Sequence, residues 1–195
     1  VEQYITGEDY RLLVINHKFI AAAERVPAHI IGDGTRTIAQ LAEIENADPR
    51  RGEGHEKVLT KIKLDSATER LLAMRGMTVE SVPDRGQVVP LKTTANLSTG
   101  GTSIDVTDRV HPANIELAER ISQLVGLDIA GIDVVAPDVE TPIAENGGGI
   151  VEVNAAPGFR MHLAPTEGKS RPVGEAVIDM LFPPGTESRI PVVTI

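Results

Sequence analysis

Cysteine is absent from this chain of 195 residues, and long apolar runs are absent as well. The first absence excludes disulfides and thiolate metal sites. No apolar run approaches the roughly 20 residues that a membrane span requires, so we expect no membrane partner and a cytoplasmic location. No signal peptide is visible either.

Basic residues are scarce, with 19 Lys and Arg against 28 Asp and Glu, which gives a formal net charge of −9. This charge argues against nucleic acid as a partner. The hydrophobic content of 41% is normal for a globular protein with one good core or two small lobes. Because the chain opens on Val1 inside strand-like sequence, we interpret it as a piece of a longer polypeptide.

Residues 9–15 and 18–25 read as two antiparallel strands, since Asn16 and His17 form a connection of hairpin length. Apolar periodicity, capping boxes and the placement of Pro and Gly predict the other elements. These are helices that begin at the capping boxes 37–40 and 66–69, a helix between Pro112 and Gly126, a last helix at 173–182, an edge strand at 87–92 and a final strand at 189–195.

Two further apolar segments, 129–136 and 150–155, read as neighbouring buried strands, yet they contain Asp133, Glu152 and Asn154. Residues two apart on a strand share a face and lie about 6.6 Å apart, so Glu152 and Asn154 project into the same space. With Asp133 they offer three oxygen donors that suit Mg²⁺. The alternative is a solvated face, or pairing with buried Lys or Arg.

Other polar features also leave alternatives open. Residues 96–103 form either a plain turn or an anion-binding loop. Arg11 lies on an exposed strand face or pairs with an anion, and His162 taken alone reads as structural. The segment EGKS at 167–170 lacks the earlier glycine of a P-loop, since that position is Leu163, and therefore reads as a surface turn.

A local excess of basic residues lies between residues 50 and 63, where five basic side chains against two acidic ones give a charge of +3. This segment is either a solvated loop or a lid that meets a polyanionic substrate or a nucleotide. The residues are Arg50, Arg51, Lys57, Lys61 and Lys63, with Glu53 and Glu56.

Six strings together resemble the C-terminal lobe of an ATP-grasp ligase, and the resemblance runs along the whole chain. They are EQYI at 2–5, AAERVPA at 22–28, DPRRGEGHEK at 48–57, TANLSTGG at 94–101, DIAGIDVV at 128–135 and VEVNAAPGFRMH at 151–162. Within the ATP-grasp ligases they are most similar to the cyanophycin synthetases, with the ATP-grasp domain of fused glutathione synthetases as the related alternative.

The resemblance implies an α+β fold, a mostly antiparallel sheet with packed helices. It implies that residues 1–188 are the C-terminal lobe of an ATP-grasp domain whose first lobe is absent. Residues 189–195 would begin the connection to a Mur-ligase-like domain. The fragment alone would then be inactive, because half of the nucleotide cleft is missing.

The resemblance also assigns roles to individual residues. Glu2, Gln3, Tyr4 and Ile5 would line the adenine site, with Asp9 on the ribose. Asp133, Glu152 and Asn154 would bind Mg²⁺. The catalytic set would be Arg11 near the γ-phosphate, with Gly158 and Arg160, and the residues facing the substrate would be Asn96, Ser98, His162, Arg50 and Arg51. One position departs from the wider superfamily: Gly131 stands where D-alanine ligases have an arginine.

The implied reaction is the ATP- and Mg²⁺-dependent addition of L-aspartate to the C-terminus of a cyanophycin or polyaspartate peptide. The other partners would be the remainder of the polypeptide and further copies in a homo-oligomer. Two alternatives remain open, namely the same fold acting on glutathione-type peptides, and a catalytically silent lobe for binding or oligomerisation.

Overall fold

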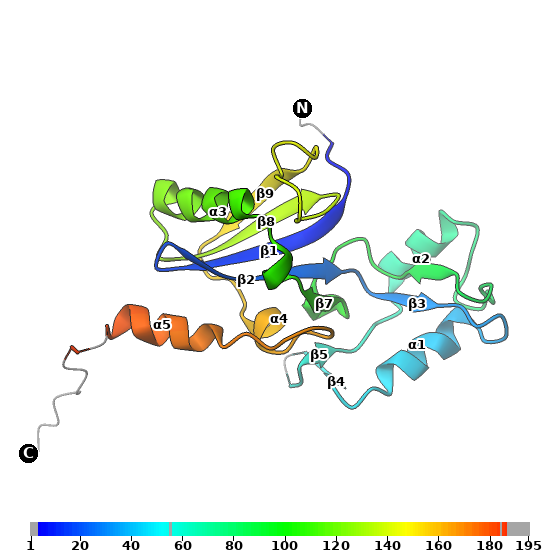
Figure 1. Ribbon diagram of the computed structural model, residues 1–195. Coiled ribbons are helices and arrows are strands. Elements are labelled where there is room, and N and C mark those ends of the chain that lie inside the picture. The colour runs from blue at the N-terminus through cyan, green and yellow to red at the C-terminus, as the bar shows by residue number, and fades with distance from the viewer. Residues whose placement is uncertain (1–3, 55, 184, 187–195) are drawn as a thin grey trace, which may run out of the picture.

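A computed structural model describes residues 4–54, 56–183 and 185–186 of the chain (Figure 1). Its centre is a sheet of five antiparallel strands, in which the two long central strands β1 and β8 are flanked by shorter ones. The order is β7 (Thr102–Asp105), β2 (Lys18–Val26), β1 (Glu8–Ile15), β8 (Ile129–Ala136) and β9 (Gly149–Asn154). The mostly antiparallel sheet predicted from the sequence is confirmed.

The hairpin between β1 and β2 turns at Asn16 and His17, which both have positive φ, 52° and 58°. Two successive residues of positive φ match the twist of the flanking strands. A bulge after Leu13 then shifts the register, so that Asp9 lies opposite Arg25. The predicted hairpin is confirmed, whereas the bulge was not predicted.

One face of the sheet is apolar and is covered by α3 (Pro112–Val125) (Figure 1). Alternate residues of β1, among them Leu12 and Val14, are buried there with the matching residues of β8. The helix begins after His111, whose ring accepts a hydrogen bond from Ala113 N, and it ends at Gly126, whose φ is 74°. The helix predicted between Pro112 and Gly126 is confirmed.

The opposite face carries α4 (Arg160–Leu163) and α5 (Val173–Leu181). Val173 of α5 packs with Leu13 and Ile15 of β1, and Met161 of α4 packs with Ala23 of β2. Both helices cover apolar ends of this face. The middle of the face, towards β8 and β9, is left for polar side chains.

Residues 28–91 form a separate small lobe between β2 and β7 (Figure 1). Its own core contains Ile30, Ile38, Leu72 and Val89, all fully buried. Its elements are β3 (His29–Ile31), α1 (Ile38–Asn46), β4 (Arg51–Gly52), β5 (Leu59–Thr60), α2 (Ser66–Ala73) and β6 (Val88–Pro90). Two short 3-10 helices, η1 (Leu97–Thr99) and η2 (Thr107–Arg109), lead back to the main sheet.

The predicted helix starts have different outcomes. The capping box at Thr37 is present, with hydrogen bonds in both directions between Thr37 and Gln40. The capping box predicted at Ser66 is wrong, because the N-cap is Asp65, whose carboxylate accepts from Ala67 N and Thr68 N. An aspartate one residue earlier offers a stronger acceptor to the same amides.

The prediction that the strand at 150–155 is buried is also wrong. The strand is β9, which has a neighbour on one side only within the described residues, and Ile150, Val151 and Glu152 are exposed. The final strand predicted at 189–195, with the proposed connection there, lies outside the described residues. None of the helices in the described part of the chain has the length and apolar character to cross a membrane.

Replacement of Asp65 by Ala should lower the free energy of unfolding by about 1 kcal/mol, since the first amides of α2 lose their acceptor. Ser66→Ala is the matched control and should change it by less than about 0.5 kcal/mol. Urea denaturation of the two variants checks this. Equal destabilisation by both changes would restore Ser66 as the cap.

Candidate functional site

The candidate site lies on the polar face of the sheet and is built by strand alternation. The strand register puts Arg11 of β1 opposite Asp133 of β8, and Asp133 opposite Glu152 of β9. Residues directly opposite in an antiparallel pair project from the same face. The polar side chains that share this face are Asp9, Arg11, Arg25, Ser103, Asp105, Asp133, Glu152 and Asn154.

Asp133 is the centre of this face and is only 6% exposed. Its carboxylate accepts from Arg11 through both the Nε and the terminal nitrogen, the latter at 2.9 Å. Arg25 lies on the other side, with its terminal nitrogen 3.2 Å from Oδ2. A buried carboxylate is strongly destabilising without such partners, so the two arginines account for its burial.

Arg25 is a residue of this site that sequence reasoning missed. It is 8% exposed and also pairs with Asp9 at 3.3 Å. A simple two-residue hairpin would pair Asp9 with Glu24 and put Arg25 on the apolar face. The bulge after Leu13 moves Arg25 to the polar face.

Glu152 and Asn154 lie beside this cluster, as the spacing predicted. Glu152 is exposed, and the Asn154 amide donates to the carbonyl of Gly131 at 3.3 Å, which leaves its oxygen available. Asp133 shares the face with both. The structure therefore brings together the three residues that were predicted to bind Mg²⁺.

The donor chemistry of these residues fits Mg²⁺ only in part. Two carboxylates and one amide oxygen are hard ligands of the kind that Mg²⁺ prefers. Glu152 and Asn154 can ligate as they stand, whereas Asp133 already receives two guanidinium groups. Among the described residues no three His, Cys, Asp or Glu side chains gather as a metal cluster, so the third ligand would be the amide of Asn154.

Gly131, where D-alanine ligases have an arginine, has no room for a side chain. A Cβ atom there would lie 2.5 Å from Cβ of Pro157 and 3.0 Å from Cδ of Arg11. The place is filled by the arm of Arg11, which crosses β8 to reach Asp133. Arg11 thus supplies the positive charge next to Gly131.

His162, predicted to face the substrate, is 2% exposed in α4. Neither ring nitrogen has a hydrogen-bond partner within the described part of the chain. Burial, with a smaller contribution from the charge of Arg11, lowers the pKa of His162 to about 4. The ring is therefore neutral at pH 7, and in this structure it packs under the polar face without reaching the surface.

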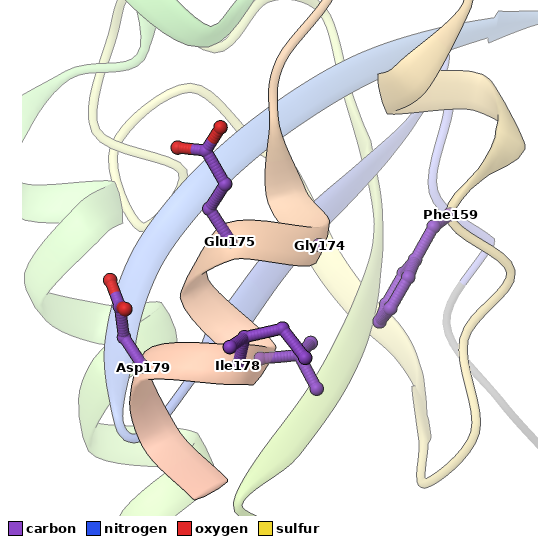
Figure 2. Close-up of a pocket in the computed structure, with 6 residues that line it drawn as sticks. Phe159, Gly174, Glu175, Ile178 and Asp179 are labelled. Carbon is purple, nitrogen blue, oxygen red and sulfur yellow. The ribbon is translucent and has the colours of Figure 1, made fainter. Parts of the chain in front are cut away.

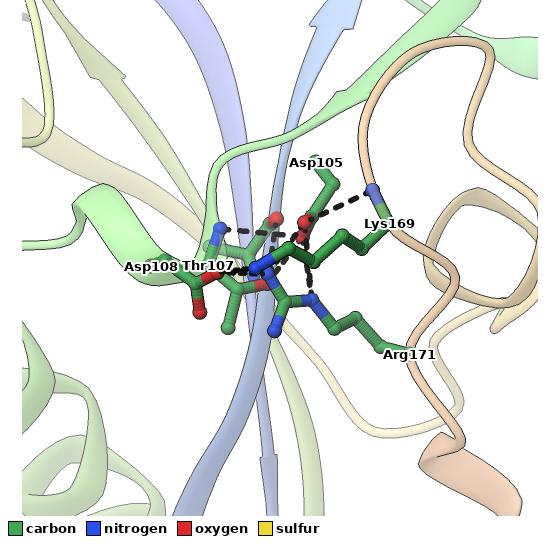
Figure 3. A network of polar contacts seen from close by, with 6 residues as sticks. Asp105, Thr107, Asp108, Lys169 and Arg171 are labelled. Atoms are coloured by element: carbon green, nitrogen blue, oxygen red, sulfur yellow. Dashed lines mark hydrogen bonds and ion pairs between the residues drawn. The ribbon is translucent and has the colours of Figure 1, made fainter.

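The segment after α4 is pinned to β7 by a cluster of charges (Figure 3). Arg171 donates to Asp105 at 2.6 Å and lies 2.9 Å from Asp108, and Lys169 lies 2.7 Å from Asp108. Burial alone would raise the pKa of Asp105, but hydrogen bonds from Arg171 and Thr107 hold it below its ordinary value. This cluster fixes the far end of the segment that contains Gly158, Arg160 and His162.

The predicted substrate residues of the smaller lobe occupy different environments. Arg51 is buried and donates to the carbonyls of Thr60 at 2.8 Å and Gly100 at 3.0 Å, so it joins the loop 51–60 to η1. Arg50 is exposed and binds Asp48. Asn96 and Ser98, at the start of η1, are exposed. Substrate roles for all four remain predictions.

Arg160 and Gly158 lie at the opening of the same region. The Arg160 guanidinium donates to the carbonyl of Lys57 at 3.2 Å, which links α4 to the loop 51–60. Gly158 is exposed, and no atom lies within 4 Å of the place that a Cβ would take. Its backbone is thus accessible to a ligand.

Of the predicted adenine site, only Tyr4 and Ile5 are described, because Glu2 and Gln3 lie outside the described residues. Tyr4 is exposed, and Ile5 packs on Gly149 at the start of β9. Asp9, the predicted ribose ligand, is half-exposed and bound to Arg25. No nucleotide role is tested by these positions.

The largest hollow, about 700 Å³, is open and lies between α5 and the loop before α4 (Figure 2). Phe159 lies across from Ile178, while Glu175 and Asp179 are its charged lining residues. Both charges are negative. This hollow is therefore unsuited to phosphate groups, and the polar face remains the candidate site.

Comparison of the whole structure first defines its class. A crystal structure of a bifunctional glutathione synthetase from Pasteurella multocida aligns with a TM-score of 0.77 and 37% identity, over 93% of this chain and 24% of that one. The prediction of an ATP-grasp lobe of the α+β class is thereby confirmed at the level of the fold. No family model matches the chain.

The particular relatives are cyanophycin synthetases. The chain is 56% identical to that of Crocosphaera subtropica and 53% identical to that of Synechocystis sp., over all 195 residues in both cases. The glutathione biosynthesis bifunctional protein GshAB of Mannheimia succiniciproducens is 40% identical over 185 residues. The predicted resemblance to cyanophycin synthetase is confirmed, and the chain spans 22% of the length of those relatives.

Gly131→Ala should lower the free energy of unfolding by about 1–3 kcal/mol, because the new methyl group collides with Pro157 and the arm of Arg11. Gly158→Ala is the matched control, since it meets open space in the same loop, and it should change stability by less than about 0.5 kcal/mol. Thermal unfolding compares the two. An unchanged midpoint for Gly131→Ala would contradict the close approach.

His162 makes stability depend on pH. Its folded-state pKa of about 4 lies below the ordinary value near 6.5, so the unfolded chain binds a proton first as the pH falls. This stabilisation is complete above about pH 6.5 and is lost between pH 6.5 and 4, by roughly 3 kcal/mol. Urea denaturation at several pH values should show a steeper loss for the wild type than for His162→Leu. Parallel curves would contradict the buried neutral ring.

Proposed function

We propose that this chain is one lobe of an ATP- and Mg²⁺-dependent carboxylate–amine ligase that adds L-aspartate to the C-terminus of cyanophycin. The observation that supports this best is the polar face of Arg11, Arg25, Asp133, Glu152 and Asn154, in a chain 56% identical to a cyanophycin synthetase over its whole length. The similarity gives the substrate, and the polar face gives the place for phosphoryl transfer.

The reaction has two steps. The γ-phosphoryl group of ATP passes to the C-terminal carboxylate of the peptide, which gives an acyl phosphate and ADP. The amine of aspartate then attacks the acyl carbon, phosphate leaves, and the amine loses a proton as the peptide bond forms. Both steps require positioned reactants and neutralised phosphate charge.

Arg11 and Arg25 would supply fixed positive charge for the phosphate oxygens. Asp133 holds both guanidinium groups in place, so little reorganisation is needed when a ligand binds. Bound Mg²⁺ would supply further charge neutralisation and a template for the phosphates. Glu152 and Asn154 would hold it, together with Asp133 when an arginine turns to the phosphate.

The accessible loop before α4 would receive the peptide carboxylate. Gly158 is exposed and lies between Pro157, which packs against Gly131, and the buried residues of α4. Backbone N–H groups in such a loop can bind the oxygen of a tetrahedral intermediate. The remaining adenine, ribose and substrate assignments, from Glu2 to His162, belong to the same proposal, as do the partners, the missing first lobe and a homo-oligomeric assembly.

The glutathione-type alternative has support from the similarity of the fold to glutathione synthetase. Sequence identity weighs against it, since it is 40% for GshAB of Mannheimia succiniciproducens and 56% for the cyanophycin synthetase of Crocosphaera subtropica. The silent-lobe alternative conflicts with the grouping of acidic and basic side chains on one face. That grouping costs stability unless function retains it.

The test uses the full-length polypeptide that contains this chain. Glu152→Ala should reduce ATP-dependent extension of a cyanophycin primer by aspartate by at least about 100-fold, because a ligand for the phosphate-bound cation is lost. Glu116→Ala removes an exposed carboxylate from α3, on the other face of the sheet, and should leave extension unchanged. Radiolabelled aspartate incorporation measures both.

Two outcomes would contradict the proposal. Full extension by Glu152→Ala would remove the metal-ligand role. Product formation only with γ-glutamylcysteine and glycine, and none with the cyanophycin primer, would favour the glutathione-type alternative.

A further inference from the structure

A second polar hollow, of about 160 Å³, lies in the smaller lobe, apart from the polar face of the sheet. Its walls are the end of β5 with the residues that follow, the start of α2, and η1. It is lined by Gly54, Thr60, Lys61, Lys63, Asp65, Lys92, Ser98 and Thr99. A neighbouring hollow of about 230 Å³ shares Asp65, Lys92 and Thr99 and extends it towards Thr93 and Thr94.

The hollow is basic within an acidic chain. Its lining has three lysines and one aspartate, a charge of +2, whereas the whole chain has −9. Glu53 lies at its edge, 3.9 Å from Lys61 and 3.2 Å from Lys63, and reduces the local charge to +1. A positive concavity in an acidic protein raises the local concentration of anions.

The three lysines differ in how firmly they are held. Lys92 is largely buried and donates to Asp65 at 2.7 Å and to Thr68 Oγ1 at 3.0 Å, so it is a fixed part of the wall. Hydrogen bonds from Lys92 and from the backbone of α2 hold the pKa of Asp65 well below its ordinary value. Lys61 and Lys63 are exposed, and their contacts with Glu53 are of the weak surface kind. These two ammonium groups can turn to a bound anion.

The position of the hollow connects it to the proposed acceptor loop. η1 has Ser98 and Thr99 on the lysine side, while Leu97 lines another hollow of about 290 Å³ together with Gly158 and Arg160. Arg160 also donates to the carbonyl of Lys57, in the loop that leads to β5. A peptide whose end lies at Gly158 would therefore reach the lysines by passing over η1.

We propose that this hollow binds the free carboxylates of an acidic peptide, and that Lys61 and Lys63 are its main contacts. The choice of a peptide rests on the proposed function, in which the substrate is an aspartate polymer that grows at its C-terminus. Ammonium groups on flexible stems suit carboxylates whose positions vary along a chain. The hydroxyl groups of Ser98 and Thr99 add neutral donors beside them.

The experiment measures binding of a fluorescein-labelled penta-aspartate peptide to the chain by fluorescence anisotropy, at low salt and without ATP. The double variant Lys61→Gln/Lys63→Gln should bind at least about 10-fold more weakly than wild type. The control Lys18→Gln/Lys169→Gln removes the same charge from two other lysines, both 73% exposed, and should change affinity by less than about 2-fold. Penta-asparagine should not compete.

Several results would overturn the proposal. Equal weakening in both double variants would indicate general charge attraction, and an unchanged affinity in Lys61→Gln/Lys63→Gln would exclude the hollow. Displacement of the peptide by equimolar inorganic phosphate or ATP would make it a phosphate site. Lys63→Gln alone, at the more exposed lysine, serves as the second variant if the double variant does not fold.

Because this assay contains no ATP and measures no turnover, its result is separable from that of the Glu152 experiment. Loss of ligation in Glu152→Ala together with normal peptide binding in Lys61→Gln/Lys63→Gln would leave the ligase and remove the peptide site. Lysine-dependent binding in a polypeptide without ligase activity would do the reverse.

Discussion

Asp133 holds two arginines in the middle of a five-stranded sheet, and the arrangement of the polar face depends on this one carboxylate. Arg11 reaches it from β1 and Arg25 from β2, so a single buried charge ties three strands together through side chains as well as backbone. Because Arg25 also binds Asp9, the two acidic and two basic groups balance. Without Asp133, two cations would be buried unpaired, which is strongly destabilising.

The same carboxylate is the point where stability and the proposed chemistry compete. A cation bound by Glu152 and Asn154 would draw on Asp133 as well, and phosphate oxygens would draw on the arginines. Each exchange replaces one charged partner by another, so the face can change partners without leaving a charge unpaired. This exchange requires that Arg11 and Arg25 be held near their place in advance, as the structure has them.

The sequence predicted the backbone of the site better than its electrostatics. The hairpin at Asn16 and His17, and the adjacency of the strands with Asp133 and Glu152, followed from turn length and hydrophobic pattern. Arg25 could not be placed, because one bulge reverses which face a strand residue occupies and no sequence signal marks that bulge. Burial of His162 and Arg51 likewise depends on segments far away in the chain, which periodicity does not report.

The break in register on β9 has a consequence for how the molecule meets others. Between Asp133 and Val134 the partner residue moves from Glu152 to Ile150, so Val151 stands as an extra residue in the outermost strand of the described sheet. An outer strand with unpaired amides and carbonyls invites another chain to add itself, and a bulge spoils the straight row that such pairing needs. The rim that presents Glu152 is thus shaped to admit a small ligand while it resists the addition of a strand.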